Sequence, residues 1–510
     1  MTHSSGETLS IWQATADMPT DAPLAENIQA EVCIVGAGIA GMSTAYSLAR
    51  EGRSVAVLDG GRIGGGMTER TTAHLSCAID DRYMEIERMH GEEGARMAAA
   101  SHAAAIDRIE RIVAEEDIDC DFERLDGYLF VPPGESTEIL DAEFDAARRA
   151  GLAGVEKVDR APLSFDTGMS LRFPRQGQFH PVKYLAGLSR AIRRMGGRIF
   201  TDTHVTAMTG GTSAKVETAG GYTVEAGSIV IATNTPINDL IAIHTKQAPY
   251  TTYVIGARVP SGSVTRALYW DTADPYHYAR LQGLADYDIL IVGGEDHKTG
   301  QAEDHAERHA RLEAWARERF QMMAETLFRW SGQVMEPVDG VAFIGRDPLG
   351  PRNVYIATGD SGMGMTHGTI AGMLITDLIL NRANPWVQLY DPSRKSLLAL
   401  GRYLQENLNV ATRYVKDFLR GGDVSGTDAI APNEGAVIRR GWKKIAVYRD
   451  EQGVLTERSA LCAHLGCIVR WNSLEKTWDC PCHGSRYDRY GQVINGPADR
   501  DLGPAEENGD

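Results

Sequence analysis

A glycine-rich turn between a strand and a helix constrains this chain more than any other feature. Residues 30–59 contain a short apolar run, the spacing G-x-G-x-x-G at Gly36, Gly38 and Gly41, a helical stretch and a second apolar run that ends in Asp59. Such glycines let backbone approach a pyrophosphate at a helix N-terminus, while the acid accepts from ribose hydroxyls. The segment therefore predicts a βαβ unit that binds a dinucleotide.

The same local order returns near residue 353, where an apolar strand pattern, a glycine-rich turn and a helical pattern follow one another. A nucleotide-binding domain that is interrupted by a second domain produces this order. We expect an α/β fold: a Rossmann-like domain interleaved with an α+β substrate domain, followed by a C-terminal all-β domain. The expected ranges are 1–80, 150–244 and 335–390 for the first domain, 81–149 and 245–334 for the second, 391–424 for a helix and linker, and 425–510 for the third.

The fingerprint alone does not separate FAD from NAD, but its position favours FAD. One large class of flavoproteins carries the motif near the N-terminus and contacts the cofactor again at the far end of the chain. Gly364, Met365 and Thr366 would place a helix N-terminus against the pyrimidine edge of a reduced flavin, where the helix dipole stabilises negative charge. The alternative is a plain glycine turn between strand and helix.

These motifs resemble the FAD-dependent D-amino acid oxidase family, which includes glycine oxidase and sarcosine oxidase. The resemblance rests on GAGIAG at 36–41, the glycine-rich segment 60–76, IVIATNTP at 229–236 and the turn at 359–366. It implies FAD as cofactor and an amine or α-amino acid as substrate. The implied cofactor-binding residues are Gly36, Gly38, Gly41, Asp59, Arg62, Gly66, Met67, Thr68, Val205, Ala232, Thr233, Gly359, Gly364, Met365 and Thr366.

Cysteine and histidine gather near the C-terminus in the order C-x-H, fifteen residues, C-x-x-H. The four residues in this pattern are Cys462, His464, Cys480 and His483. Two thiolates and two imidazoles are the ligands that give a [2Fe-2S] cluster a high potential. A zinc site is the alternative, because zinc also binds Cys and His.

The surrounding segments CAHLGC and CPCHGSRYDRYGQVINGPA are similar to the Rieske proteins of respiratory cytochrome bc complexes. This resemblance implies that Cys462, His464, Cys480 and His483 bind a Rieske [2Fe-2S] cluster. It assigns Cys467 and Cys482 to a disulfide between the two cluster loops. It also matches Ser485 and Tyr487 to hydroxyl groups that donate to a cluster sulfide and to a ligand sulfur.

The sequence gives less evidence about catalytic residues near the flavin than about the cofactor sites. Lys298 aligns with a lysine that sarcosine oxidase places near the flavin, and the alternative is an exposed turn. His74 and Tyr278 are expected to line the substrate pocket. We find no arginine for a substrate carboxylate. His305 and His309 are expected on a solvated helix face, because the helix predicted over 302–328 is polar.

Composition limits the partners. With 52 basic and 69 acidic residues, the formal charge of −17 opposes nonspecific binding to nucleic acid. No stretch reaches the roughly 18 apolar residues of a membrane span, and the first residues lack the pattern of a signal peptide. We therefore expect a cytoplasmic protein without a transmembrane segment. The oligomeric state does not follow from the sequence.

Together these features indicate an FAD-dependent oxidoreductase that oxidises a small amine, an N-alkyl amine or an amino-acid-like substrate. Electrons are expected to pass from FAD to the Rieske cluster and then to an external acceptor such as a cytochrome, a ferredoxin or a quinone. Two alternatives stay open: an oxygen-using flavin oxidase with an accessory cluster, and a non-catalytic redox sensor or electron carrier.

Overall fold

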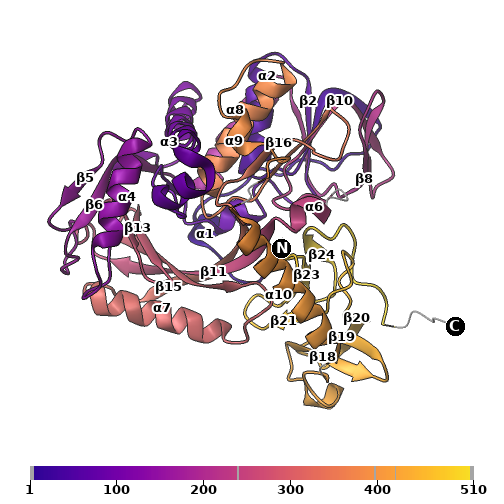
Figure 1. Ribbon diagram of the computed structural model, residues 1–510. Coiled ribbons are helices and arrows are strands. Elements are labelled where there is room, and N and C mark those ends of the chain that lie inside the picture. The colour runs from indigo at the N-terminus through magenta and orange to yellow at the C-terminus, as the bar shows by residue number, and fades with distance from the viewer. Residues whose placement is uncertain (1–4, 238–240, 396–397, 420, 506–510) are drawn as a thin grey trace.

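The computed structural model describes residues 5–237, 241–395, 398–419 and 421–505 (Figure 1). One sheet carries the glycine fingerprint and has the path β16-β17-β10-β1-β2-β7, with β9 and β8 attached to β10. Its strands are β1 (Ile28–Val35), β2 (Val55–Leu58), β7 (Arg198–Phe200), β8 (Val205–Thr209), β9 (Ala214–Thr218), β10 (Thr223–Ile231), β16 (Phe343–Arg346) and β17 (Val354–Thr358). The path from β17 to β7 is parallel, so the strands share one carboxyl edge, where open α/β sheets bind ligands.

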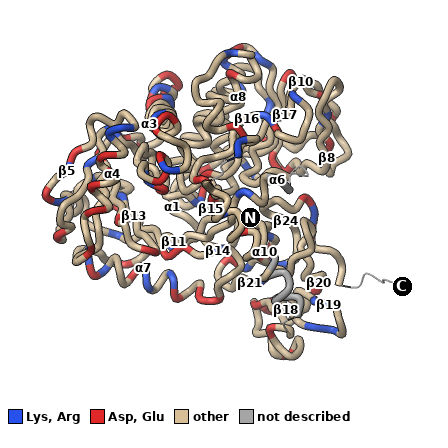
Figure 2. Tube along the Cα trace, viewed as in Figure 1, with Lys and Arg blue, Asp and Glu red and all other residues tan. Residues whose placement is uncertain are grey.

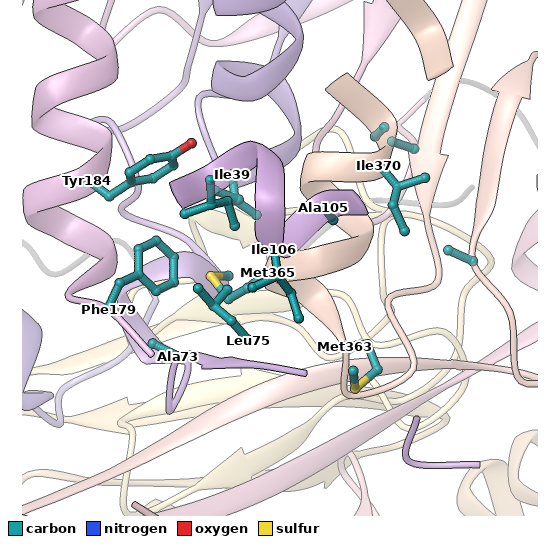
Figure 3. Close-up of a cluster of buried hydrophobic side chains, with 14 of the residues drawn as sticks. Ile39, Ala73, Leu75, Ala105, Ile106, Phe179, Tyr184, Met363, Met365 and Ile370 are labelled. Carbon is teal, nitrogen blue, oxygen red and sulfur yellow. The ribbon is translucent and has the colours of Figure 1, made fainter. Parts of the chain in front are cut away.

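Helices pack closely on this sheet. They are α2 (Ile39–Arg50), α5 (Pro181–Arg194), α8 (Gly364–Ile379) and α9 (Val387–Tyr390), and α3 (Tyr83–Glu115) packs on α8 and α9. A Cβ at Gly372 would lie 2.7 Å from the carbonyl carbon of Ser43, so glycine lets α8 approach α2. Figure 3 shows Ile39 of α2, Ile106 of α3 and Met365 of α8 in one buried cluster. This packing fixes the start of α2 beside the start of α8.

A second, nine-stranded sheet has the path β15-β11-β14-β13-β12-β4-β6-β3, with β5 paired to β6. Its strands are β3 (His74–Leu75), β4 (Glu123–Phe130), β5 (Glu156–Val158), β6 (Ser170–Gln178), β11 (Gln247–Val259), β12 (Leu268–Asp271), β13 (His277–Gly283), β14 (Asp288–Lys298) and β15 (Thr326–Pro337). We expected 150–180 in the nucleotide-binding body, but β5 and β6 belong to this sheet. The physical reason is pairing, since β6 forms an antiparallel ladder with β4.

The helix α7 (His305–Arg319) packs against β11 and β14, and α4 (Glu138–Arg149) packs against α3. We expected His305 and His309 on a solvated face, and this expectation is wrong. Their exposed fractions are 7% and 3%, and both rings lie beside Tyr253 of β11. Charged residues of both signs occupy the outer face of α7 instead (Figure 2).

The C-terminal part contains two small antiparallel sheets. Their strands are β18 (Glu434–Arg440), β19 (Lys443–Arg449), β20 (Leu455–Ser459), β21 (Arg470–Asn472), β22 (Thr477–Asp479), β23 (Arg486–Asp488) and β24 (Val493–Asn495). The remaining elements are α1 (Ile11–Thr15), α6 (Ile241–His244), α10 (Leu400–Leu419) and the short 3-10 helices η1 (Met67–Arg70) and η2 (Thr427–Ala429). In Figure 1, α10 links the two parts and runs beside the small sheets.

Among the residues that the structure describes, no helix has both the length and the apolar character needed to span a membrane.

Candidate functional site

A cavity of about 1350 Å³ lies at the carboxyl edge of the parallel sheet and reaches the second sheet. Its volume exceeds the roughly 300–1,000 Å³ of an ordinary ligand pocket, so it has room for a dinucleotide and a substrate. Most of the predicted cofactor residues line it: Gly36, Gly38, Asp59, Arg62, Gly66, Met67, Thr68, Val205, Ala232, Thr233, Gly359, Gly364 and Met365. Two distant segments, the starts of α2 and α8, thus meet at one cavity.

The turn after β1 has the shape that the fingerprint predicts. Gly36 has φ +104°, and a Cβ there would lie 2.4 Å from the carbonyl oxygen of Ala232. Asp59 accepts from the backbone N–H of Ala37 at 2.7 Å and of Gly61 at 2.8 Å. Burial raises the pKa of Asp59, while these two N–H groups favour its ionised form. Asp59 therefore holds the turn that would carry the pyrophosphate.

Gly41 and Thr366 support this site from outside the cavity. A Cβ at Gly41 would lie 1.9 Å from the carbonyl oxygen of Gly36, so only glycine lets α2 pack on the turn. The hydroxyl of Thr366 lies 2.8 Å from Nδ1 of His102 and donates to the carbonyl of Met363 at 3.1 Å. Both residues shape the backbone rather than face a ligand.

The other end of the cavity is lined by aromatic rings and carboxylates. Both predicted pocket residues lie here: His74 and Tyr278, whose rings are 5.7 Å apart. Burial lowers the pKa of His74 to about 3, so this imidazole is neutral at physiological pH. Four acids also line the cavity and were not found by sequence reasoning: Asp80, Asp296, Glu336 and Asp360. They come from four separate segments and form no motif.

Lys298 lies outside the large cavity. Its Nζ is 2.5 Å from Oε2 of Glu406 on α10, and it borders a small second cavity beside His483. It is absent from the lining of the large cavity. Lys298 ends β14, where it pairs with Tyr250 of β11, and its side chain reaches Glu406 of α10 instead of the large cavity. We therefore do not assign Lys298 to the flavin.

The C-terminal cysteines and histidines converge on one buried site. Cys467 and Cys482 form a disulfide, as the Rieske resemblance implies, so their sulfurs are not free thiolates. Cys462 and Cys480 are buried free cysteines, and the rings of His464 and His483 are 5.0 Å apart. Nδ1 of His483 is buried without a hydrogen-bond partner among the described residues. This set of two sulfurs and two imidazoles fits a [2Fe-2S] cluster with mixed ligands.

Hydroxyl groups lie near the sulfur of Cys462, which the sequence predicts as a cluster ligand. Tyr487, which is fully buried, has its Oη 3.2 Å from Sγ of Cys462. Ser485 is also buried, and its Oγ accepts from the backbone N–H of Ala498 at 3.0 Å. Hydrogen bonds from Cys480 and Tyr487 lower the pKa of Cys462 to about 6, which favours the thiolate that binds iron.

We predict that Tyr487→Phe lowers the midpoint potential of the cluster by roughly 60–130 mV. A hydrogen bond to a charged group contributes roughly 1.5–3 kcal/mol, and 1.4 kcal/mol corresponds to about 59 mV for one electron. The reduced cluster is more negative and loses more from this change. A redox titration followed by electron paramagnetic resonance measures the shift, with Tyr490→Phe as the control because Tyr490 is 47% exposed. Equal midpoint potentials in the two variants would mean that the hydroxyl of Tyr487 does not stabilise the reduced cluster.

The imidazole side of this site is covered by the first part of the chain. The ring of His244 on α6 lies 5.0 Å from that of His464 and 6.4 Å from that of His483. Nε2 of Gln333 on β15 donates to the carbonyl of Gly484 at 2.9 Å. Gln333 also lines the large cavity. One side chain therefore links the cavity with the residue that follows His483.

A buried ion pair joins the two parts. Arg70 and Glu475 have side chains with no exposed surface, and Nη1 of Arg70 lies 3.0 Å from Oε1 of Glu475. The hydroxyls of Thr8 and Ser331 donate to the same carboxylate, each at 2.5 Å. Burial opposes ionisation of Glu475, but the neighbouring arginines outweigh it and hold its pKa at about 2. The C-terminal sheets are thus fixed against the cavity rather than tethered by a linker alone.

Comparison with known proteins agrees with both halves of this geometry. Residues 31–378 match the DAO family, described as FAD dependent oxidoreductase, and residues 423–504 match the Rieske [2Fe-2S] domain. The chain belongs to the DAO family of FAD-dependent oxidoreductases. It joins a DAO domain, which binds FAD, to a Rieske domain, which binds a [2Fe-2S] cluster. These matches confirm the predicted family, cofactors and fold class.

Relatives share all or part of this arrangement. The chain is 30% identical to the putative Rieske 2Fe-2S iron-sulfur protein YhfW of Bacillus subtilis, over 96% of both chains. It is 28% identical to gamma-glutamylputrescine oxidoreductase of Escherichia coli, over 70% of this chain and 85% of that protein. Glycine oxidase from Geobacillus kaustophilus superposes with a TM-score of 0.61 at 18% identity, covering 72% of this chain and 99% of that one. The last similarity shows that the DAO domain has the same fold as this glycine oxidase.

Proposed function

We propose that the DAO domain oxidises a small amine or amino-acid-like compound and that the Rieske domain carries the electrons to an external acceptor. Bound FAD would take two electrons from the substrate, and the cluster would pass them on singly. The ligands that we propose for the cluster are Cys462, His464, Cys480 and His483. The external acceptor and the cytoplasmic location stay predictions.

One observation carries this proposal: the Rieske domain forms a wall of the cavity that the FAD fingerprint lines. Asp488, Val493 and Asn495 border the same space as Gly36 and Gly38. Nδ2 of Asn495 donates to Gln333, which in turn donates to the carbonyl of Gly484. An accessory domain that took no part in the reaction would have no need of this buried, polar contact with the cavity.

An amine is favoured over an amino acid by the residues at the substrate end. The basic residues that line the cavity, Arg62, Arg70, Lys476 and Arg489, each form an ion pair with an acid of the protein. A carboxylate placed there would lack a partner, and an unpaired buried charge is costly.

Anaerobic rapid mixing of the intact protein with a panel of primary and N-alkyl amines tests this function. We expect loss of flavin absorbance first and the signal of the reduced cluster afterwards. We expect Cys480→Ser to keep flavin bleaching and to slow reduction of a one-electron acceptor by at least about tenfold, because it removes a cluster ligand.

The matched control is Cys120→Ser, which makes the same change at a buried cysteine outside the cluster site. It should reduce the acceptor at the rate of the unaltered protein. If the cluster is reduced before the flavin, or if Cys480→Ser leaves acceptor reduction unchanged, the Rieske domain is not the exit for electrons. Oxygen consumption without acceptor reduction would identify the oxygen-using oxidase instead.

A further inference from the structure

The substrate end of the cavity concentrates negative charge. Asp80, Asp296, Glu336 and Asp360 line it, and Asp81 shares the hydroxyl of Ser361 with Glu336. We call these five acids the carboxylate group. On the outer surface, acids and bases are interspersed, as along α7 (Figure 2). Inside the cavity, the carboxylate group has no basic side chain within salt-bridge distance among the described residues.

The basic residues that line the cavity form ion pairs with acids outside the carboxylate group. Arg62 pairs with Glu69, and Arg70 pairs with Glu475. At the rim, Lys476 pairs with Glu434, and Arg489 pairs with Glu7. The carboxylate group therefore has no ion-pair partner among the described residues, and only bases at longer range, such as Arg308 near Asp296, offset its charge. Burying such charge is costly unless a ligand supplies the opposite charge.

Two contacts show how the protein holds these acids without a cation. The hydroxyl of Ser361 lies 2.7 Å from Oδ2 of Asp81 and 2.9 Å from Oε2 of Glu336. A hydroxyl has one proton to donate, so it cannot fully satisfy both carboxylates, and protonation of one of them would relieve their repulsion. Burial, reinforced by Asp81 and Asp80, accordingly raises the pKa of Glu336 well above its usual range.

Asp296 has this kind of support at one oxygen only, because the hydroxyl of Thr252 hydrogen-bonds to its carboxylate. It lies near the end of β14 and faces the cavity, yet its buried Oδ1 has no hydrogen-bond partner among the described residues. Burial raises its pKa to about 6, so much of it is ionised near neutral pH. A cation bound in the cavity beside this residue would offset the charge of the carboxylate.

The spacing of the carboxylates and the aromatic residues that line the cavity indicate which kind of cation can bind. In the described part of the chain, the one group of three possible metal ligands within 4.8 Å of one another is Cys467, Cys480 and Cys482. No three members of the carboxylate group therefore lie this close together. Trp270, Tyr276 and Tyr278 line the same space, and aromatic faces attract organic cations.

We propose that the substrate is an aliphatic diamine or polyamine, which binds as a multiply charged cation and carries no carboxylate. This inference rests on the proposed amine oxidation and narrows its substrate class. One ammonium group pairs with Asp296 and a second pairs with Asp80 or Asp360. The chain between them lies against the aromatic walls.

Calorimetry on the dithionite-reduced holoprotein measures binding without turnover. The probes are the straight-chain diamines from 1,3-diaminopropane to 1,6-diaminohexane, with butylamine and 4-aminobutanoate for comparison. We expect the best diamine to bind at least about tenfold more tightly than butylamine, since a second buried ion pair forms. We expect 4-aminobutanoate to bind more weakly than butylamine. Binding of 4-aminobutanoate as tight as that of the best diamine would overturn the proposal.

The variant Asp296→Asn should weaken diamine binding by at least about tenfold and change butylamine binding much less. Asp80→Asn provides a second test, and flavin and cluster absorbance show that each variant is folded and loaded. Glu93→Gln is the control, because it removes one negative charge from an exposed site on α3. If both cavity variants keep the preference for diamines, the carboxylate group does not recognise the substrate.

Turnover is measured separately on the oxidised protein. Preferential binding of diamines without flavin bleaching by any amine would leave this inference standing and would overturn the proposed oxidation. Flavin bleaching by monoamines without preferential binding of diamines would overturn this inference and would support the proposed amine oxidation.

Discussion

The Gly41→Ala variant is expected to be isolated with at least about tenfold less FAD than the unaltered protein. Its new methyl group would lie 1.9 Å from the carbonyl oxygen of Gly36. That atom belongs to the backbone of the fingerprint turn, so the contact is relieved only by moving α2 away from β1. Overpacking of this kind is costly, and here the displaced element is the one that would hold the pyrophosphate.

FAD content per chain is measured by absorbance after denaturation. The matched control is Gly401→Ala, because a methyl group added at Gly401 would meet no described atom within 4 Å and the backbone there does not have a positive φ. The absorbance of the [2Fe-2S] cluster reports whether the Rieske domain is still folded in each variant. A Gly41→Ala protein with its full complement of FAD would mean that the turn is not the pyrophosphate site.

The Glu475→Gln variant is expected to lower the free energy of unfolding by about 3–5 kcal/mol. The substitution leaves the guanidinium of Arg70 buried and without its countercharge, which is the costly way to break a buried pair. Denaturant unfolding followed through flavin fluorescence and cluster absorbance measures the loss. Both signals should change at lower denaturant concentration, because the pair joins the two domains.

Two comparisons sharpen this test. The double variant Arg70→Met with Glu475→Leu should recover most of the loss, since no unpaired charge remains. The surface variant Glu457→Gln should cost less than about 1 kcal/mol, because its pair with Arg440 is partly exposed. A loss in Glu475→Gln as small as that in Glu457→Gln would show that the domains are not held by this pair.

The same carboxyl predicts a dependence of stability on pH. The pKa of Glu475 is about 2 in the folded protein, against an ordinary value of 4.5. A depressed folded pKa contributes stability that is present above about pH 4.5 and is lost as the pH falls toward 2. The difference corresponds to about 3 kcal/mol at neutral pH. The Gln variant should lack this part of the acid dependence.

The fixed position of the Rieske domain bears on how electrons would leave it. The imidazoles of His464 and His483 lie beside His244 of the DAO domain, and that of His483 is buried. This side of the cluster would therefore receive electrons from the flavin cavity. An external acceptor would have to approach from another face of the domain or after the domain had moved.

The sequence by itself determined the two cofactor sites, because each depends on a short contiguous motif. A pyrophosphate site needs only a strand, three glycines and a helix start, and a Rieske site needs only two loops with fixed Cys and His spacing. The family resemblance supplied the disulfide between Cys467 and Cys482, and the structure contains it.

Only the tertiary structure decided what surrounds these sites. Asp80, Asp296, Glu336 and Asp360 are separated by up to 280 residues and meet because two sheets and α8 converge on one cavity. Three further features also depend on which strands become neighbours. They are the position of Lys298 outside the large cavity, the burial of His309 and the pairing of Arg70 with Glu475. A local sequence pattern cannot specify such neighbours. Which side chains meet across a sheet is set by strand pairing, hydrogen-bond register and packing, and these join residues that are far apart in the sequence.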